Sequence, residues 1–249
     1  MDNSQALLLA RARDLVKQCE RTATAKFSAF LDGAEQAEIT EKIGFYGLNV
    51  KMFGGYDGAE RKILGIFPEW EEAEDNAFPI SVLKIKSGYG RELTHRDYLG
   101  TLMGQGIDRS KTGDIIIDGK TAYVFVNADI AQYLADNMKK IGNQGADIDI
   151  CGISEAKIPE PKREKVGAVC ASLRLDAVVS ALCNISRAQS AKLINASLVK
   201  VNYRECADVS KVIAENDLIS VRGHGRFVFL HADGETRKGR LHITAEKYI

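Results

Sequence analysis

The chain has 249 residues, of which 45% are hydrophobic and 27% charged, a composition that is typical of a folded multi-domain protein and excludes a disordered chain or a collagen-like or coiled-coil rod. No apolar stretch reaches the roughly 18 residues of a membrane span, so we expect a soluble, cytoplasmic protein without membrane contact. Lys and Arg number 9 against 14 Asp and Glu in residues 1–75, 10 against 10 in 76–158, and 15 against 10 in 159–249, which indicates that one C-terminal module contacts phosphates.

The first 75 residues predict a small, helix-first α/β domain. Apolar residues recur at three- and four-residue steps over 4–31, and this predicts one amphipathic helix that includes Phe27 and Phe30. A second helical stretch and two β-like runs follow, at 34–42, 48–53 and 61–67. The acidic segment 68–76 is expected to be a solvated linker in which Trp70 anchors one domain to the next.

Residues 76–154 predict a ferredoxin-like domain of the kind that RNA-recognition domains also use. Its elements follow the order β-α-β-β-α-β. Strands are predicted at 80–86, 113–118, 122–127 and 146–151, and helices at 93–106 and 130–142. Residues 155–171 contain two prolines and several basic residues, and we expect them to form an extended, exposed linker.

Residues 172–249 hold the pattern that points to a function. An apolar stripe predicts a first short helix, and Ser186 with Gln189 forms a capping box that opens a second one, from which Ala188 and Ile194 are expected to face inward. Short strands joined by glycine and asparagine turns follow. The basic residues of this segment fall outside the apolar stripes: Arg174, Arg187, Lys192, Lys200, Arg222 and Arg226.

Four motifs in this segment resemble the S4 RNA-binding domain in their order and spacing. They are RLD at 174–176, SRAQSAKLI at 186–194, VKVN at 199–202 and ENDLISVRGHGRF at 215–227. The resemblance implies an RNA-binding surface formed by Arg174, Ser186, Arg187, Lys192, Lys200, Asn202, Arg222, Gly223, Gly225 and Arg226. The sequence departs from the family at Ser197 and Tyr203, where S4 domains often have Gly, so a left-handed turn there would be strained by ~1 kcal/mol or reshaped.

Upstream, FPISVLKIKSG and the run from Leu93 to Ile117 resemble the central domain of the YlmH-type proteins. These proteins combine a helical N-terminal region, an RRM-like middle and a C-terminal S4 domain. The resemblance implies a ribosome-associated bacterial protein that binds rRNA, with tRNA as a further candidate and the large subunit as the expected particle. S4-domain relatives act on stalled peptidyl-tRNA in ribosome quality control, and the YlmH family has also been connected with cell division.

The middle segment offers candidates for a second RNA contact. Arg109 and Lys111 precede Gly113 in RSKTG, and His95 and Arg96 are expected on the first turn of a helix. Tyr123 lies where an RNA-recognition domain carries a stacking aromatic. Its partnering strand lacks an aromatic, which favours packing of this face against a neighbouring domain.

Motifs that suggest catalysis or metal binding have simpler structural interpretations. His95-Arg96-Asp97 resembles a kinase catalytic loop, but Thr94 and Asp97 form a capping box and the other kinase elements are absent. Gly88-x-Gly90 and Gly223-x-Gly225 are assigned to turns. Asp147 and Asp149 are expected to face solvent. Five cysteines are scattered without a CxxC pair, which indicates reduced, mostly buried thiols.

The sequence therefore predicts an α+β protein of three small domains with no catalytic residues, metal or cofactor. We expect a non-enzymatic RNA-binding factor that is monomeric away from the ribosome. Two alternatives remain: an RNA-modifying enzyme that carries an S4 domain, and an interaction scaffold for division proteins.

Overall fold

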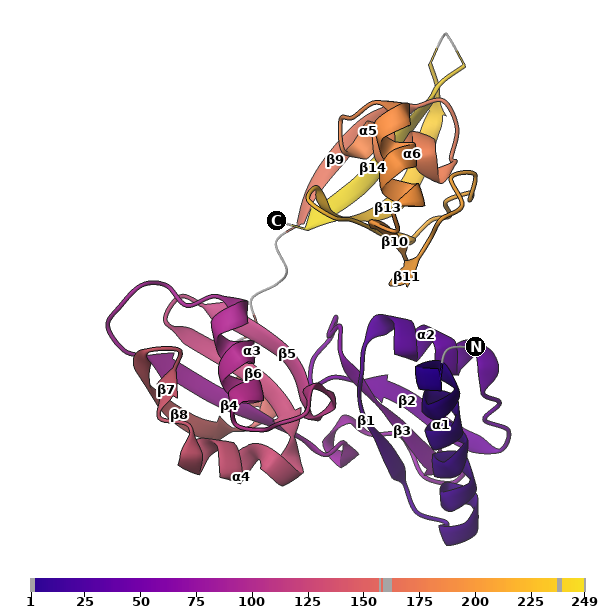
Figure 1. Cartoon of the computed structure of the whole chain (residues 1–249). Coiled ribbons are helices and arrows are strands. Elements are labelled where there is room, and N and C mark those ends of the chain that lie inside the picture. The colour runs from indigo at the N-terminus through magenta and orange to yellow at the C-terminus, as the bar shows by residue number, and fades with distance from the viewer. Residues whose placement is uncertain (1–2, 157, 159–162, 237–238, 249) are drawn as a thin grey trace. The chain divides into compact units, whose positions relative to one another are not determined.

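The computed structural model describes residues 3–156, 158, 163–236 and 239–248, and the chain divides into two compact units, residues 1–159 and 160–249 (Figure 1). Both units combine helices with antiparallel sheets, so the predicted multi-domain α+β class is confirmed. No helix among the described residues is long and apolar enough to cross a membrane.

The N-terminal part of unit 1 is a three-stranded antiparallel sheet with helices on one face. Its elements are α1 (Asn3–Thr22), β1 (Lys26–Leu31), α2 (Gly33–Lys42), β2 (Leu48–Phe53) and β3 (Lys62–Pro68), and the strand order is β1-β3-β2. The helices and the sheet enclose an apolar core that consists of Leu9, Ala12, Cys19, Leu31, Ile39, Ile43, Leu64 and Ile66.

The prediction of a single helix over 4–31 is wrong. α1 ends at Thr22, and Ala23 has a left-handed φ of 51°, which an α-helix cannot continue through. Lys26–Leu31 then pairs with β3 as a strand. The spacing of Phe27 and Phe30 fits a helix, but the neighbouring strand supplies hydrogen bonds that a local pattern cannot reveal.

The middle part of unit 1 has the predicted ferredoxin-like order. Its elements are η1 (Asp75–Ala77), β4 (Ile80–Ser87), α3 (His95–Gly104), η2 (Arg109–Lys111), β5 (Thr112–Asp118), β6 (Thr121–Asn127), α4 (Ala128–Asn137), β7 (Lys140–Ile141), β8 (Gln144–Cys151) and η3 (Ile153–Glu155). The antiparallel sheet has the order β5-β6-β4-β8-β7, and α3 and α4 contribute to the core on one face. The helix predicted to reach Gly142 ends at Asn137, because β7 and β8 form a hairpin through Gly142, whose φ is 57°.

The second faces of the two sheets pack against each other. The shared cluster contains Phe30, Ile63, Phe67, Phe78, Ile80, Val82, Tyr123 and Phe125. A Cβ on Gly113 would lie 2.7 Å from Phe30 Cε1, and one on Gly55 would lie 2.4 Å from Phe125 Cδ1, so glycine permits this close approach. Residues 1–75 and 76–154, predicted as separate domains, therefore share a core within one unit. Trp70, the predicted anchor, is 75% exposed.

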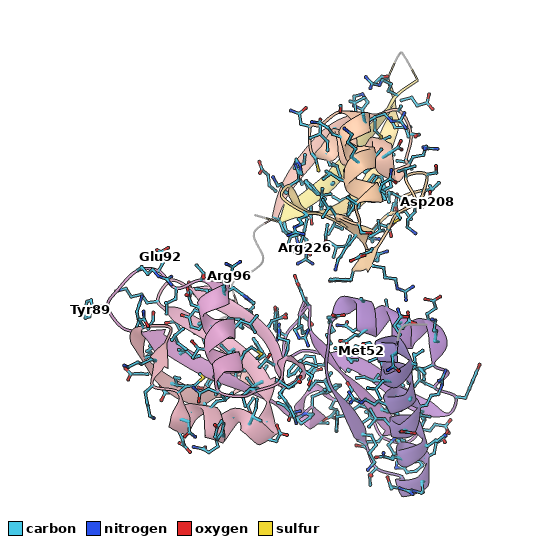
Figure 2. The ribbon with its side chains drawn as sticks, viewed as in Figure 1. Met52, Tyr89, Glu92, Arg96, Asp208 and Arg226 are labelled. Atoms are coloured by element: carbon cyan, nitrogen blue, oxygen red, sulfur yellow. The ribbon has the colours of Figure 1, made fainter. Side chains whose placement is uncertain are left out.

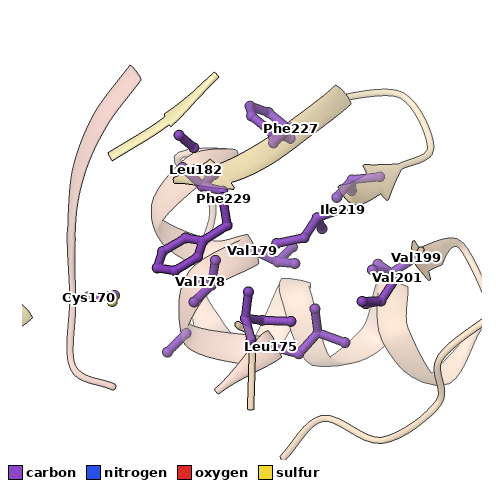
Figure 3. Close-up of a cluster of buried hydrophobic side chains, with 14 of the residues drawn as sticks. Cys170, Leu175, Val178, Val179, Leu182, Val199, Val201, Ile219, Phe227 and Phe229 are labelled. Carbon is purple, nitrogen blue, oxygen red and sulfur yellow. The ribbon is translucent and has the colours of Figure 1, made fainter. Parts of the chain in front are cut away.

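Unit 2 is a six-stranded antiparallel sheet covered on one face by two helices. Its elements are β9 (Arg163–Cys170), α5 (Leu175–Leu182), α6 (Arg187–Asn195), β10 (Val199–Val201), β11 (Arg204–Glu205), β12 (Leu218–Val221), β13 (Gly225–Glu235) and β14 (Leu241–Tyr248). The strand order is β11-β10-β12-β13-β14-β9. Figure 3 shows the core, in which Leu175, Val178 and Val179 of α5 face Ile219, Phe227 and Phe229 of the sheet.

The predicted linker at 155–171 differs from the structure over its second half. Arg163–Cys170 is strand β9, which pairs with β14 from Tyr248↔Arg163 to Leu241↔Cys170. Cys170 is buried in the core of unit 2. Proline and charge in the preceding residues concealed this strand, whose partner lies more than 70 residues away.

Candidate nucleic-acid interface

The two helices of unit 2 place basic side chains on one exposed surface. Ser186 caps α6, since its Oγ accepts a hydrogen bond from Gln189 N at 3.2 Å and Gln189 Oε1 accepts one from Ser186 N at 3.1 Å. The predicted capping box is thereby confirmed. Arg187 and Lys192 are exposed on this helix. Ala188 is also exposed, in contrast to the prediction, whereas Ser190 and Ile194 are buried.

A buried carboxylate holds two of the predicted RNA-binding arginines. Asp176 Oδ2 accepts a hydrogen bond from Arg187 at 2.5 Å, and Oδ1 accepts one from Arg174 Nε at 3.2 Å. Burial acts to raise the pKa of Asp176, but the hydrogen bonds and charges of the two arginines outweigh it and hold the pKa below its usual value. Both arginine side chains remain partly exposed, at 53% for Arg187 and 41% for Arg174. Asp176 therefore fixes the two arginines at the junction of α5 and α6.

A basic groove lies at one end of the sheet. It has a volume of about 570 Å³, and its lining includes Lys200, Arg222, Gly223, Gly225 and Arg226, five of the residues that the S4 resemblance implies. Ser197, Leu198, Glu205, Ser220 and Val221 complete the lining. Lys200 pairs with Ser220, and Ser220 pairs with Arg226, so these three residues lie side by side on neighbouring strands. Figure 2 labels Arg226 on this unit.

Left-handed residues shape the walls of this groove. Gly223 and Gly225 have φ values of 82° and 116° in the turn between β12 and β13, as the turn assignment predicted. Ser197 and Tyr203 have φ values of 54° and 67°, so the left-handed turns are kept even though the usual glycines are absent.

Asn202 has a structural role in the turn between β10 and β11. Its Oδ1 accepts a hydrogen bond from Leu218 N at 2.9 Å, and its Nδ2 donates one to Asp217 Oδ1 at 2.7 Å. Asn202 and Tyr203 are both left-handed, which gives a two-residue hairpin turn of type I′ geometry. The side chain predicted to touch RNA is thus already engaged within the protein.

One of the candidates for a second RNA contact in unit 1 is contradicted, and another already has a structural role. Tyr123 is only 3% exposed and belongs to the core between the two sheets, so it cannot stack on a base. Arg109 donates to the backbone oxygens of Thr112 and Gly113 at 2.7 and 3.0 Å. Burial, and then the nearby Arg61, lowers the pKa of Arg109 to about 10. These interactions make Arg109 a structural residue of the loop before β5.

The remaining candidates of unit 1 lie at the surface. Lys111 forms an ion pair with Asp129 at 2.5 Å. His95 and Arg96 are exposed on the first turn of α3, and Figure 2 labels Arg96 there. The capping box below them is confirmed, since Asp97 accepts hydrogen bonds from Thr94 N and Thr94 Oγ1 at 2.8 Å. His95 and Arg96 stay predictions as RNA contacts.

Three further residues of unit 2 lie close to the predicted RNA-binding residue Arg226 or to its aromatic neighbour, although no sequence motif pointed to them as binding residues: Arg163, Tyr203 and Tyr248. Arg163 lies in the predicted linker, and its Cζ lies 4.7 Å from the centre of the Tyr248 ring. Arg226 Cζ lies 5.0 Å from the Tyr248 ring and 5.8 Å from the Tyr203 ring. The alternation of apolar residues in REKVGAVC and LHITAEKY was the available signal for the edge strand β9 and its neighbour β14, which carry Arg163 and Tyr248.

Metal-binding and thiol chemistry receive no support from the described part of the chain. It contains no cluster of three or more His, Cys, Asp or Glu side chains that could hold a metal ion. Asp147 and Asp149 are exposed, as predicted. The five cysteines are free, with Cys19 and Cys170 buried and the others half-buried. Burial raises the pKa of Cys183 to about 11, so its thiol is a poor nucleophile at neutral pH.

Comparisons with known proteins assign the class of each part. Residues 73–155 match the family described as "Putative RNA-binding domain in YlmH", and residues 173–219 match the S4 domain. The chain is 33% identical over 223 residues to the ribosome-associated protein quality control protein P2 of Bacillus subtilis, covering 89% of this chain and 87% of that protein. A solved structure, the cell division protein ylmH from Streptococcus pneumoniae, superposes with a TM-score of 0.54 at 25% identity, covering 64% of this chain and 97% of that one.

Two RNA-binding modules in one α+β chain define an RNA-binding protein of the S4 class. The chain belongs to the YlmH-type family of S4-domain RNA-binding proteins.

Proposed function

We propose that this chain is a non-enzymatic factor that binds ribosomal RNA of the large subunit and acts in ribosome-associated quality control, with tRNA as a second ligand. The observation that carries the proposal is the basic groove of unit 2. Lys200 lies within the region that matches the S4 domain, and Arg222 and Arg226 lie just beyond its end at residue 219. The name of the Bacillus subtilis relative supports the ribosomal setting.

The chemistry of the groove suits phosphate. Arginine presents a planar set of donors that fits phosphate oxygens, and lysine adds a flexible point charge. Between these basic side chains the lining includes the turn glycines Gly223 and Gly225 and the short side chains of Ser197 and Ser220. A folded RNA can therefore be recognised mainly by its shape. Residues 159–249 also carry the excess of positive charge in the sequence.

The non-enzymatic part of the proposal rests on how the candidate catalytic groups are used. Asp97, the acidic residue of the kinase-like motif, accepts hydrogen bonds from Arg91 and Thr94. Asp114, a further carboxylate of unit 1, accepts them from Tyr56 and from the backbone of Glu60 and Arg61. Each carboxylate thus has a structural role. Mass spectrometry of RNA incubated with the protein and common cofactors should show no modified base, and a modified nucleotide would support the enzyme alternative instead.

A double charge reversal tests the groove. Lys200→Glu combined with Arg222→Glu should weaken binding of rRNA fragments by at least tenfold, because two phosphate contacts become repulsive. For the unaltered chain, neutralising roughly four to six phosphates gives a slope of log K against log salt of about −3 to −5. Lys17→Glu with Arg21→Glu, on the exposed side of α1, is the matched control and should bind normally. Equal affinity of both double variants would contradict the proposal.

A second candidate function is a scaffold for cell-division proteins. It is favoured by the name of the solved relative, which covers 64% of this chain, and by the acidic balance of residues 1–75. Pull-down with and without nuclease separates the two functions, since partners of a scaffold remain bound after nuclease treatment and ribosomal partners are lost.

A further inference from the structure

A row of basic and aromatic residues crosses the unit 2 sheet. Lys200 on β10 pairs with Ser220 on β12, which pairs with Arg226 on β13. Arg226 lies over the Tyr248 ring of β14, and Tyr248 pairs with Arg163 on β9. The row therefore runs over five adjacent strands, a width of about 19 Å at the usual strand spacing.

This row lies on the face of the sheet that the helices do not cover. Side chains alternate between the two faces along a strand. Phe227 of β13, Ala245 of β14 and Cys170 of β9 belong to the core under α5 and α6. An odd number of positions along the strand separates each of these core residues from the residue of the row on the same strand. The side chains of Arg226, Tyr248 and Arg163 therefore belong to the other face.

Tyr248 is flanked by two guanidinium groups. Arg163 Cζ and Arg226 Cζ lie 4.7 and 5.0 Å from the centre of its ring. Lys165 lies on the same face as Arg163 by alternation. Among the described residues, the acidic neighbours of the row are Glu246, which forms an ion pair with Arg163 at 3.1 Å, and Glu205, which pairs with Lys200 across β10 and β11. Lys165, Lys200 and the two arginines outnumber these carboxylates, so the face attracts an anion.

We propose that this helix-free face binds an unpaired segment of RNA, with one base inserted between the Tyr248 ring and the guanidinium of Arg163, which moves away from the ring to admit it. The inference rests on the proposed RNA-binding function and adds the class of RNA that this face takes. An aromatic ring beside guanidinium planes stacks on any exposed base, whereas the bases of a duplex are already stacked on each other. Lys200, Ser220 and Arg226 belong to both the row and the groove, so a strand that leaves the groove meets Tyr248.

The test uses the full chain and two RNA probes of equal length. One is a single-stranded oligonucleotide that contains 2-aminopurine, and the other is a blunt duplex. Tyr248→Leu should weaken binding of the single strand about tenfold and abolish the quenching of 2-aminopurine, because an aliphatic side chain cannot stack. It should leave duplex binding within twofold of the original. Tyr248→Phe keeps the ring and should preserve both signals.

Controls keep the outcome clear. Tyr46→Leu changes a tyrosine of unit 1 that is 92% exposed and should alter neither signal. If Tyr248→Leu fails to fold by circular dichroism, Arg163→Gln at the sheet edge replaces it and should weaken only the single strand, about threefold. Unchanged single-strand binding in the folded variants, or an equal loss for both probes, would overturn the inference. If the original chain binds neither probe, the proposed function itself fails.

Discussion

At the scale of single residues, Asp176 determines what Arg187 contributes. From sequence alone, Arg187 is a basic residue on the first turn of a capped helix, and a charge reversal there would be expected to leave the fold intact. The structure shows it hydrogen-bonded to a carboxylate that comes 11 residues earlier in the chain. Local capping boxes could be predicted because all their atoms lie within four residues, whereas this pairing depends on how two helices pack.

The first prediction is that Arg187→Glu destabilises unit 2 by about 1–2 kcal/mol at pH 7, because a buried carboxylate then faces a second one. The pKa of Asp176 is lowered in the folded protein, so the stabilisation by its ion pairs is present above the unfolded pKa of about 3.9 and is lost as the pH falls through the folded pKa. The difference between the two proteins should therefore shrink in acid. Urea unfolding from pH 7 to pH 3 measures this.

The control for this experiment is Lys192→Glu, an exposed change on the same helix, which should cost less than about 0.5 kcal/mol. Equal stability of Arg187→Glu and the original chain at pH 7 would show that the pair with Asp176 contributes nothing.

The second prediction concerns Ser197, whose φ of 54° is strained for a residue with a Cβ. Ser197→Gly should raise the free energy of unfolding by about 0.5–1 kcal/mol, since relief of the strain exceeds the added freedom of the unfolded chain. Ala196→Gly is the matched control, because Ala196 has a φ of −85° and the same change there should destabilise. Differential scanning calorimetry would contradict the strain argument if both substitutions lowered the melting temperature.

At the scale of elements, strands were harder to predict than helices. The ferredoxin-like order followed from alternation and turn residues, and the S4 helices followed from apolar stripes. β1 and β9 were missed because their identity depends on partners that are distant in sequence. β9 pairs with β14 at the far end of the chain, and its residues read alone resemble a charged linker.

The third prediction is that the RNA-binding module begins at β9 and not at residue 172. A fragment of residues 160–249 should fold, whereas a fragment of residues 172–249 lacks β9, one of the two strands that pair with β14, together with buried Cys170. We expect the shorter fragment to melt at least about 10 °C lower, or not to fold, by circular dichroism. Identical melting curves for the two fragments would show that β9 is dispensable.

At the scale of the whole molecule, the chain combines unit 1, whose two sheets share a hydrophobic core, with unit 2, which carries the excess of positive charge. From the sequence, the packing of the two sheets in unit 1 could be anticipated only through Tyr123, whose face was expected to pack against a neighbouring domain. Contacts between two sheet faces leave no other local signature in the sequence. Asp114 of β5 connects the middle part of unit 1 to its N-terminal part. It accepts hydrogen bonds from Tyr56 Oη at 2.9 Å and from the backbone of Glu60 and Arg61 at 2.7 and 3.1 Å.

The fourth prediction is that Asp114→Ala destabilises unit 1 by about 2 kcal/mol, because three donors lose their acceptor. Hydrogen exchange should show β3 and β6 losing protection together, while unit 2 keeps its protection. Asp118→Ala, an exposed change on the same strand, is the control. Loss of protection in β6 alone would indicate that the two sheets unfold independently.

Association with the ribosome is tested most directly by sedimentation of the full chain with purified ribosomal subunits through sucrose gradients at low and high salt. We expect the chain to sediment with the large subunit at low salt, to be released at high salt, and to remain at the top of the gradient when Lys200 and Arg222 are both replaced by Glu. Sedimentation of that double variant with the large subunit like the original chain, or absence of the original chain from every ribosomal fraction at low salt, would contradict binding through the groove.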